Sequence, residues 1–517
     1  MSFTRAGIRP LLGSVLAPSR TALSSAPPHS FQLVTLNRCL HASARSCNRA
    51  SSQTRSLLDQ ANVRATLRAH MLGRKANSPA VQQPAHRIRS LTTATLDTPH
   101  ATDARAATGA PPTAEPRMTT PLVSKYLFVV AGMVFCIVIV GGMTRLTESG
   151  LSITEWNVVK GTLLPLSHDE WMSEFEKYKA TPEWKINNQH ITMTDFKKIY
   201  MWEWSHRMLG RLIGLTFLLP LPYFIYRRQL ARTALAPLLG IATLIGGQGA
   251  LGWYMVKSGL DSKSVEELGG VPRVSQYRLA SHLGMAFCVF ALCLRMGLGV
   301  KRDWQLVRLG KGLSGIQTPA ESLRVLNGPV ANRFRIGVTA LSGLVFLTAF
   351  SGAFVAGLDA GLIYNEWPTM GDGLSPGMGE LYKDYYARKA DKSDKWWRNM
   401  FENPTTAQFD HRMLAYTTFT SVVTLFALSR RPSLRAHLPP LTQRLIKASL
   451  HMSVLQVVLG ISTLLYLVPT HLAATHQAGS LVLLTLMLGV GASLRRPGKV
   501  AQEVMRIRAI QQKAARL

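Results

Sequence analysis

Charged residues are scarce in this chain, and their scarcity excludes an ordinary soluble protein. Lys, Arg, Asp and Glu make up 17% of the 517 residues, below the roughly 25% of a typical soluble domain. Hydrophobic residues reach 47% and are gathered into long runs. Apolar runs of this kind indicate segments that cross a membrane. The composition therefore favours a polytopic membrane protein over a string of soluble domains.

Cysteine is also rare, with five residues in the chain. Cys39 and Cys47 lie near the N-terminus, whereas Cys136, Cys288 and Cys293 lie in apolar runs. In such surroundings a thiol behaves as a small hydrophobic group. Because the long polar loops contain no cysteine, we predict no disulfide in them.

Acidic residues are absent before Asp59, although the leader is strongly basic. Residues 1–117 contain fourteen Arg and one Lys, are rich in Ser, Ala and Thr, and have no long apolar core. A secretory signal needs such a core, whereas a mitochondrial presequence is basic, rich in Ser and poor in acids. We therefore predict a mitochondrial presequence and disordered leader over 1–117. A disordered basic tail is the alternative.

The net charge of +31 does not indicate nucleic-acid binding. A nucleic-acid interface gathers its cations into one patch or stripe, but here the basic residues flank apolar runs. The basic leader and basic loops account for the charge. We therefore expect no nucleic-acid partner.

Eight apolar stretches are long enough to cross about 30 Å of hydrocarbon at about 1.5 Å per helical residue. They lie near 124–143, 205–226, 234–256, 276–299, 334–357, 409–429, 443–467 and 471–494. The even-numbered loops and the tail are basic, whereas the loop 148–200 is rich in acids. Because basic loops stay on the inner side, both termini and the even-numbered loops are expected to face the matrix.

Four short motifs occur twice, in the same order, at offsets of 211, 205, 208 and 194 residues. The pairs are Ser149-Gly150-Leu151 with Glu155-Trp156 and Ala360-Gly361-Leu362 with Glu366-Trp367; His206-Arg207-Met208-Leu209 and His411-Arg412-Met413-Leu414; Gln248-x-x-Leu251-Gly252 and Gln456-x-x-Leu459-Gly460; Ser281-His282 and Thr475-His476. Such spacing indicates a tandem duplication of a four-helix unit.

The predicted fold is therefore all-α, with eight transmembrane helices in two tandem four-helix bundles. An even number of helices per unit gives both halves the same orientation, with a pseudo-two-fold axis along the membrane normal. The predicted parts are a leader (1–117), an N-terminal half (118–300), a matrix linker (301–333), a C-terminal half (334–494) and a basic matrix tail (495–517).

Four histidines stand near the start of the even-numbered spans, at matched depth: His206, His282, His411 and His476. Two histidines at equal depth on facing helices can bind one haem iron from both sides. The duplication then predicts two haem sites, one for each half. The alternatives are histidines bonded to neighbouring helices, or a zinc or copper site, although no Cys or carboxylate cluster completes either pair. His168, His190, His451 and His471 fall outside this pattern.

Arg207 and Arg412 directly follow two of these histidines. A buried arginine needs an anionic partner, and a haem propionate is one candidate. Bonds to loop carbonyls, or to Glu148, Glu155 or Glu366, are the alternative. The two Glu-Trp segments are expected to form interfacial or re-entrant loops over each haem pocket, although Trp favours membrane interfaces in any case.

The two halves differ beside the first histidine of each pair. Glu203 precedes His206 by three residues and so shares its helix face, whereas the equivalent position before His411 is Gln408. A carboxylate can exchange protons and an amide cannot. The N-terminal site is therefore expected to carry out chemistry, and the C-terminal site to store or deliver electrons. An interfacial carboxylate without a catalytic role is the alternative.

These motifs together resemble the haem A synthase family, over about residues 124–494. The resemblance rests on Gly141 to Ser152, Glu203-Trp204-Ser205-His206-Arg207, Gln248 to Gly252, Asp359 to Met370, Asp410-His411-Arg412 and Thr475-His476-Gln477. Many bacterial members carry paired cysteines in the outer loops. Because this chain lacks them, it resembles the subtype without cysteines, and the basic leader resembles that of a eukaryotic member.

The resemblance implies an oxidoreductase that converts haem O to haem A, for cytochrome c oxidase, by oxidising the C8 methyl group to a formyl group. It implies that His206 and His282 bind the substrate haem, that His411 and His476 bind a prosthetic haem b, and that Glu203 is catalytic. It further implies haem O synthase and a ferredoxin-type electron donor as partners, inner-membrane lipid surroundings, and a homo-oligomer.

Two rival functions share parts of this pattern. A bis-His cytochrome b-type electron carrier or reductase would share the histidine pairs, but it would not need the Glu203/Gln408 difference. A solute transporter with parallel repeats would need broken helices and polar sites at mid-membrane, whereas these histidines lie near one interface. Retention of haem O or haem A by the purified protein distinguishes the synthase from both.

Overall fold

The structure is a computed structural model that describes residues 114–157, 163–261 and 273–516. The predicted presequence lies outside the described residues except for its last few positions. Every regular element in the described part is a helix, and no strand occurs there. This agrees with the predicted all-α class.

Each half contains four long helices. Those of the first half are α2 (Pro121–Leu146), α5 (Met193–Leu218), α7 (Leu235–Leu260) and α9 (Gln276–Val307). Those of the second half are α11 (Pro329–Gly357), α14 (Pro404–Arg430), α16 (Pro440–Leu465) and α17 (Thr470–Ser493). At about 1.5 Å per residue, each is long enough to cross the hydrocarbon core.

Shorter helices fill the loops. The loop after α2 contains α3 (His168–Lys179) and α4 (Pro182–Ile186), and α6 (Pro220–Tyr226) and η2 (Arg232–Ala234) connect α5 to α7. The linker between the halves contains α10 (Pro319–Asn327). The second half adds η3 (Ala360–Leu362), α12 (Met378–Leu381), η4 (Asp384–Tyr386), α13 (Lys395–Glu402), α15 (Pro432–Arg435) and, after α17, α18 (Lys499–Ala514).

Local sequence signals account for the helix starts. Proline occupies the first turn of α2, α11, α14 and α16, where its missing N–H costs no helical hydrogen bond. Thr192 and Asp195 form a capping box at the start of α5, which satisfies two amide groups that the helix leaves free.

Seven of the long helices in the described part are apolar enough to cross a membrane, which supports a polytopic membrane protein. The exception is α14, which corresponds to the sixth expected span, 409–429. It is as long as the others, with 27 residues, but its first third is polar and includes Asp410 and Arg412. The count of eight spans therefore stays a prediction.

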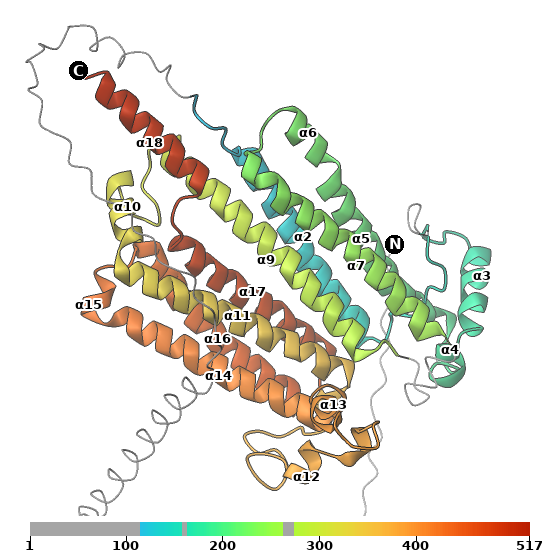
Figure 1. The fold of residues 1–517 in the computed structure, drawn as a ribbon. Helices are drawn as coiled ribbons and strands as arrows, with labels where there is room; N and C mark the ends of the chain where they lie inside the picture. The colour runs from blue at the N-terminus through green and yellow to red at the C-terminus, as the bar shows by residue number, and fades with distance from the viewer. Residues whose placement is uncertain (1–113, 158–162, 262–272, 517) are drawn as a thin grey trace, which may run out of the picture. The chain divides into compact units, whose positions relative to one another are not determined.

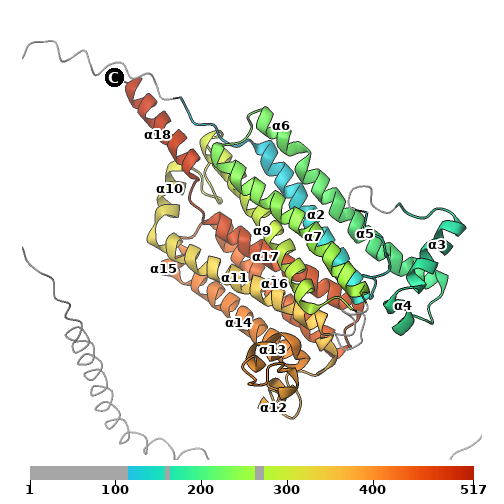
Figure 2. The same cartoon turned by 45° about the vertical axis from the view of Figure 1, so that its right-hand side comes forward.

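The packing repeats between the halves, as Figures 1 and 2 show. In the first half α2 packs on α5 and α9, and α7 packs on both of these helices. In the second half α11 packs on α14 and α17, and α16 packs on both of these. Between the halves, contact of α9 with α11 is matched by contact of α17 with α2. This exchange of equivalent helices is what a two-fold relation requires.

Several helix boundaries differ from the expected ones. The helix α9 ends at Val307 rather than near 299, and α11 begins at Pro329 rather than near 334, so both extend into the expected linker 301–333. The second long helix begins at Met193 rather than near 205, because Phe196 and Tyr200 are buried in an aromatic cluster that extends the helix beyond its apolar part. The tail 495–517 contains the helix α18, whose Ala501, Val504 and Ile507 are buried.

Candidate functional site

Two pairs of histidine rings face each other, one pair in each half. His206 on α5 and His282 on α9 have ring centres 6.2 Å apart and ring planes inclined by 62°. His411 on α14 and His476 on α17 have ring centres 6.5 Å apart and planes inclined by 85°. The structure thus brings together both pairs that the duplication predicts. The other histidines considered above are all exposed: His168, His190, His451 and His471.

A glycine of the neighbouring helix lies behind each ring of the first pair. A Cβ atom on Gly141 of α2 would lie 2.7 Å from Cε1 of His206. A Cβ atom on Gly252 of α7 would lie 3.6 Å from Cε1 of His282 and 3.7 Å from the ring of Trp156. The first of these positions has no room for a larger side chain without a shift of the ring.

The second pair has the same support. A Cβ atom on Gly352 of α11 would lie 3.3 Å from Cε1 of His411, and one on Gly460 of α16 would lie 3.1 Å from Cε1 of His476. Gly352 and Gly460 each stand five residues before the last residue of their helix, Gly357 and Leu465. Gly141 likewise stands five residues before Leu146, the end of α2. Both histidine pairs therefore lie at the same level, near the C-terminal ends of α2, α11 and α16.

This geometry fits a haem held between two imidazoles. An iron bound from both sides by ring nitrogens, at about 2 Å each, places the two ring centres roughly 6 Å apart. The separations of 6.2 and 6.5 Å agree with that value. Within the described residues, no cluster of three or more His, Cys, Asp or Glu could hold an isolated metal ion. The histidine pairs therefore suit haem better than zinc or copper.

Arg207 fixes the loop that follows α2. Its guanidinium donates hydrogen bonds to the carbonyl oxygens of Ile153, at 2.8 Å, and Glu155, at 2.7 Å. The ring of Trp156 lies 4.7 Å from the guanidinium carbon, in a cation–π contact. These contacts hold the first Glu-Trp segment against α5. A contact between Arg207 and a propionate stays a prediction.

Arg412 repeats this arrangement in the second half. It donates to the carbonyl oxygens of Tyr364, at 3.2 Å, Glu366, at 2.8 Å, and Thr369, at 2.9 Å. Tyr364 and Glu366 are the positions that correspond to Ile153 and Glu155 at the 211-residue offset. The two arginines therefore make equivalent contacts to equivalent loops, and the propionate contact of Arg412 likewise stays a prediction.

The side chains of the two loop glutamates turn away from these contacts. The Glu155 carboxylate accepts a hydrogen bond from Lys177 at 2.8 Å, and this bond lowers the pKa of Glu155. The Glu366 carboxylate accepts a hydrogen bond from the amide of Gly371. In both loops it is thus the backbone at the Glu position, rather than its carboxylate, that contacts the arginine.

Glu203 is buried beside the first histidine pair, with 3% of its surface exposed. One carboxylate oxygen accepts a 2.6 Å bond from Arg207. The other accepts bonds from the Ser152 hydroxyl, at 2.7 Å, and from the Ile153 amide, at 2.9 Å. A buried carboxylate with three donors is held in one orientation.

Gln408 occupies the equivalent place in the second half and is also buried. Its amide nitrogen donates to the Tyr364 carbonyl at 3.1 Å, and its Oε1 has no hydrogen-bond partner among the described residues. The structure therefore places a charged, ion-paired carboxylate next to one histidine pair and a neutral amide next to the other.

The sequence reasoning missed a second difference between the halves. The Ser351 hydroxyl lies 2.7 Å from Nδ1 of His411, where it orients the ring. The equivalent residue of the first half, at the 211-residue offset, is Val140, which offers no hydroxyl. Extending the repeat alignment back along α2 and α11 would have found this difference, and also the pairing of Gly141 with Gly352.

Glu183 is a second buried carboxyl near the first site. It lies in α4 with 4% of its surface exposed, and its Oε2 has no hydrogen-bond partner among the described residues. Burial, together with the negative charges of Glu203 and Glu148, raises the pKa of Glu183 well above its ordinary value. The sequence analysis did not expect the helix α4 in this loop.

Comparison with known proteins identifies the family. Residues 124–488 match the family model described as "Cytochrome oxidase assembly protein". This chain belongs to that family.

Curated members of the family are similar over most of the chain. The identity to Heme A synthase COX15 of Saccharomyces cerevisiae is 43% over 384 residues, 73% of this chain and 76% of that protein. The identity to Heme A synthase COX15 of Homo sapiens is 44% over 378 residues, 73% of this chain and 84% of that protein. A Heme A synthase-mitochondrial ferredoxin fusion protein of Schizosaccharomyces pombe is 45% identical over 367 residues, 70% of this chain and 58% of that protein.

Proposed function

We propose that this chain is a haem A synthase of the mitochondrial inner membrane, which oxidises the C8 methyl group of haem O to a formyl group. The observation that carries the proposal is a duplicated histidine pair with a carboxylate beside only one copy. The similar proteins in yeast and man, both named heme A synthase, support it.

The two sites have different tasks in this proposal. Haem O, as substrate, binds between His206 and His282, next to Glu203. A resident haem b binds between His411 and His476, next to the neutral Gln408. When bound, haem b supplies one-electron redox chemistry. The Ser351 hydroxyl orients His411, as outer-shell partners of ligating histidines do.

Residues of the first half prepare the substrate site. Glu203 is the acid–base group, because it is the buried carboxylate one helical turn from His206. Arg207 holds that carboxylate and the loop carbonyls at once, so the proton-exchanging group and the loop share one anchor. Trp156 stacks on the same guanidinium.

The proposal extends to partners and location. The electron donor is a ferredoxin-type protein, and the fusion of a heme A synthase with a mitochondrial ferredoxin in a similar protein supports this. Haem O synthase supplies the substrate, and the chain forms a homo-oligomer. Both termini face the matrix, because the even-numbered loops are basic.

Histidine substitutions and haem chromatography test this division. His411→Ala or His476→Ala should remove bound haem b and its absorbance. His206→Ala or His282→Ala should leave most haem b in place but abolish haem A formation in cells that carry only the variant. Equal loss of haem b from all four variants would contradict two distinct sites, and normal haem A in all of them would favour an electron carrier.

A further inference from the structure

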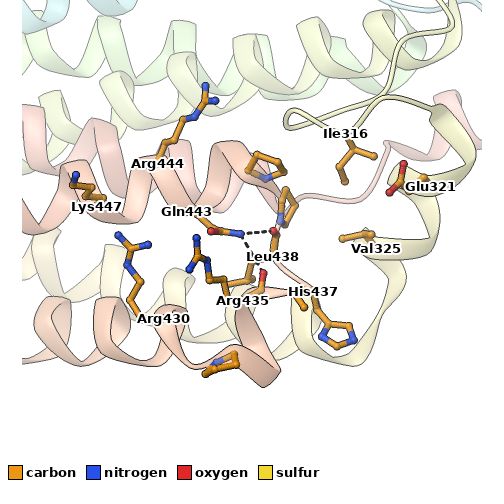
Figure 3. Close-up of a pocket in the computed structure, with 14 residues that line it drawn as sticks. Ile316, Glu321, Val325, Arg430, Arg435, His437, Leu438, Gln443, Arg444 and Lys447 are labelled. Atoms are coloured by element: carbon orange, nitrogen blue, oxygen red, sulfur yellow. Dashed lines mark hydrogen bonds between the residues drawn. The ribbon is translucent and has the colours of Figure 1, made fainter.

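A basic cavity lies at the end of the second half opposite the histidine pairs. Its volume is about 790 Å³, within the roughly 300–1,000 Å³ of sites for small molecules. It is bounded by the end of α14, by α15 with the turn after it, by the start of α16 and by the linker around α10. Figure 3 shows the side chains that line it.

Four exposed cations from three elements face this cavity: Arg430, Arg435, Arg444 and Lys447. None of them makes an ion pair within the described part of the chain. Glu321 on α10 is the one acidic residue among the lining residues. The cavity therefore carries a net positive charge that the described residues do not neutralise, which favours an anionic ligand.

The backbone around the cavity is held in place. The Gln443 side chain donates to the carbonyl oxygens of Arg435, at 3.1 Å, and Leu438, at 3.0 Å. The Leu441 amide donates to the Ser314 carbonyl at 3.0 Å, which ties the linker to α16. The cations thus project from helices whose connecting turn is fixed, rather than from a free tail, so less conformational entropy is lost when they bind a ligand.

The depth of the cavity indicates what fills it. Arg444 and Lys447 lie four and seven residues beyond Pro440, inside the membrane-crossing helix α16. At about 1.5 Å per residue, Lys447 lies roughly 10 Å along the helix axis from Pro440, the first residue of α16. A long cationic side chain at that depth reaches toward the lipid headgroup level.

Exposed apolar side chains stand on two of the helices that bound the cavity. Leu441 on α16 is 40% exposed and Val423 on α14 is 37% exposed. Apolar side chains of this kind can contact acyl chains while the cations of the cavity bind the headgroup. Arginine binds phosphate oxygens in pairs through its planar guanidinium.

We propose that this cavity is a binding site for the phosphate headgroup of an anionic phospholipid. Basic pockets between membrane helices are the usual sites for such headgroups. The tendency of inner loops to be basic explains the presence of cations, but it does not require that they surround one cavity. That difference makes the proposal testable with charge-matched variants.

The experiment titrates the purified full-length chain in neutral detergent with diphosphatidylglycerol and measures bound lipid by native mass spectrometry. The double variant Arg435→Gln/Arg444→Gln removes two cations of the cavity. The control Arg227→Gln/Arg431→Gln removes two exposed cations of the same kind of loop that do not line it. The haem absorbance of each variant confirms that it is folded.

We expect the affinity of the cavity variant for the lipid to fall about tenfold or more, with the control close to wild type, since each cation near an anionic headgroup contributes separately. An equal fall in both variants would overturn the proposal in favour of general charge attraction. Displacement of the lipid by inorganic phosphate at equal concentration would show a free-anion site instead. If the cavity variant bound the lipid as well as the wild type but no longer bound an acidic ferredoxin, the cavity would be a protein-docking surface instead.

Discussion

At the scale of single residues, the first site depends on how Glu203 is held. Arg207, Ser152 and the Ile153 amide donate to its two oxygens, so the carboxylate cannot turn freely. Arg207 is itself buried and has no other acidic partner at hydrogen-bond distance in the described part of the chain. The ion pair therefore joins the proposed acid–base role of Glu203 to a structural one, and a useful variant must separate the two.

Glu203→Gln separates them, because the amide keeps the volume and most hydrogen bonds but cannot titrate. We expect a folded protein that retains its haem b absorbance, since Arg207 still holds the Ile153 and Glu155 carbonyls. Haem A should fall about a hundredfold, the usual size of a lost acid–base group, and haem O or a hydroxylated intermediate should accumulate. Chromatography of total haem measures this. Gln408→Glu is the matched control in the second half. Wild-type levels of haem A in Glu203→Gln would leave Glu203 with a structural role only.

Glu183 leads to a prediction for how the stability of the protein depends on pH. Its pKa is raised above the ordinary 4.5 by burial and by the Glu203 and Glu148 charges. As pH rises past 4.5, the unfolded chain therefore releases this proton first, and stability falls until the raised pKa is passed. We expect Glu183→Gln to flatten the fall in Tm that begins as pH rises past 4.5. The exposed Glu176→Gln should leave the slope unchanged, and an unchanged slope in Glu183→Gln would exclude this group as its source.

At the scale of helices, close approach between neighbours fixes the histidine rings. Each ring packs on a glycine of an adjacent helix, but the clearance differs from one position to another. A methyl group at 2.7 Å from a ring atom forces a movement, whereas at 3.6 Å it makes an ordinary contact. The four positions therefore differ in their tolerance of alanine.

Gly141→Ala and Gly252→Ala test this difference within one site. The first variant should displace His206 and lower haem A formation about tenfold or more, while haem b in the other half stays bound. The second should behave close to wild type. Glycine to alanine within a helix favours the helix by about 1 kcal/mol, so helix propensity cannot explain a loss in the first. Equal haem A in the two variants would show that the ring moves without cost.

The helices also show what the sequence can and cannot reveal. Apolar runs predicted the long helices, because hydrocarbon thickness imposes a length on each span. They did not predict the start of α5, where Phe196 and Tyr200 extend the helix by packing on Trp171. Nor did they predict α18, since its buried face is short and its composition is basic. In both cases the helix is stabilised by packing against elements that are distant in the sequence.

At the scale of the whole molecule, the two halves are joined by polar contacts as well as by helix packing. Arg145 at the end of α2 donates to the Ala356 carbonyl at 2.9 Å and forms a 2.7 Å ion pair with Asp359, after α11. Gln477 of α17 donates to the Val138 carbonyl of α2 at 3.1 Å. These contacts align the ends of the helices that bear the histidine sites.

Arg145→Gln should loosen this junction without touching either histidine pair. We expect a loss of about 1–2 kcal/mol, because the ion pair is partly exposed while the carbonyl contacts are more sheltered. Tm should fall by a few degrees with both haem signals intact. Arg273→Gln is the control, since its contact with the same Asp359 is longer, at 3.5 Å. An equal shift in both variants would mean that Arg145 adds nothing beyond surface charge.

The repeat made much of this arrangement predictable, because equal motifs at regular offsets require equal folds. It predicted both histidine pairs and the Glu203/Gln408 difference, since these lie within matched motifs. It could not predict that Ser152 reaches Glu203 across 51 positions of sequence. Bonds from Arg207 to loop carbonyls were one of the two expectations for that residue, but the sequence could not tell which carbonyls accept them. Such contacts depend on how a loop folds back, and no local pattern records them.

The shared level of the two histidine pairs has an electrical consequence. Gly141, Gly352 and Gly460, which support three of the rings, all stand five residues from a helix end. With a haem in each site as proposed, an electron that passes between the halves travels parallel to the membrane plane. Moving one charge across the bilayer involves about 2.3 kcal/mol per 100 mV, but movement at constant depth involves none. Electron transfer between two haems held in these sites would therefore be non-electrogenic, and the membrane potential would neither drive nor slow it.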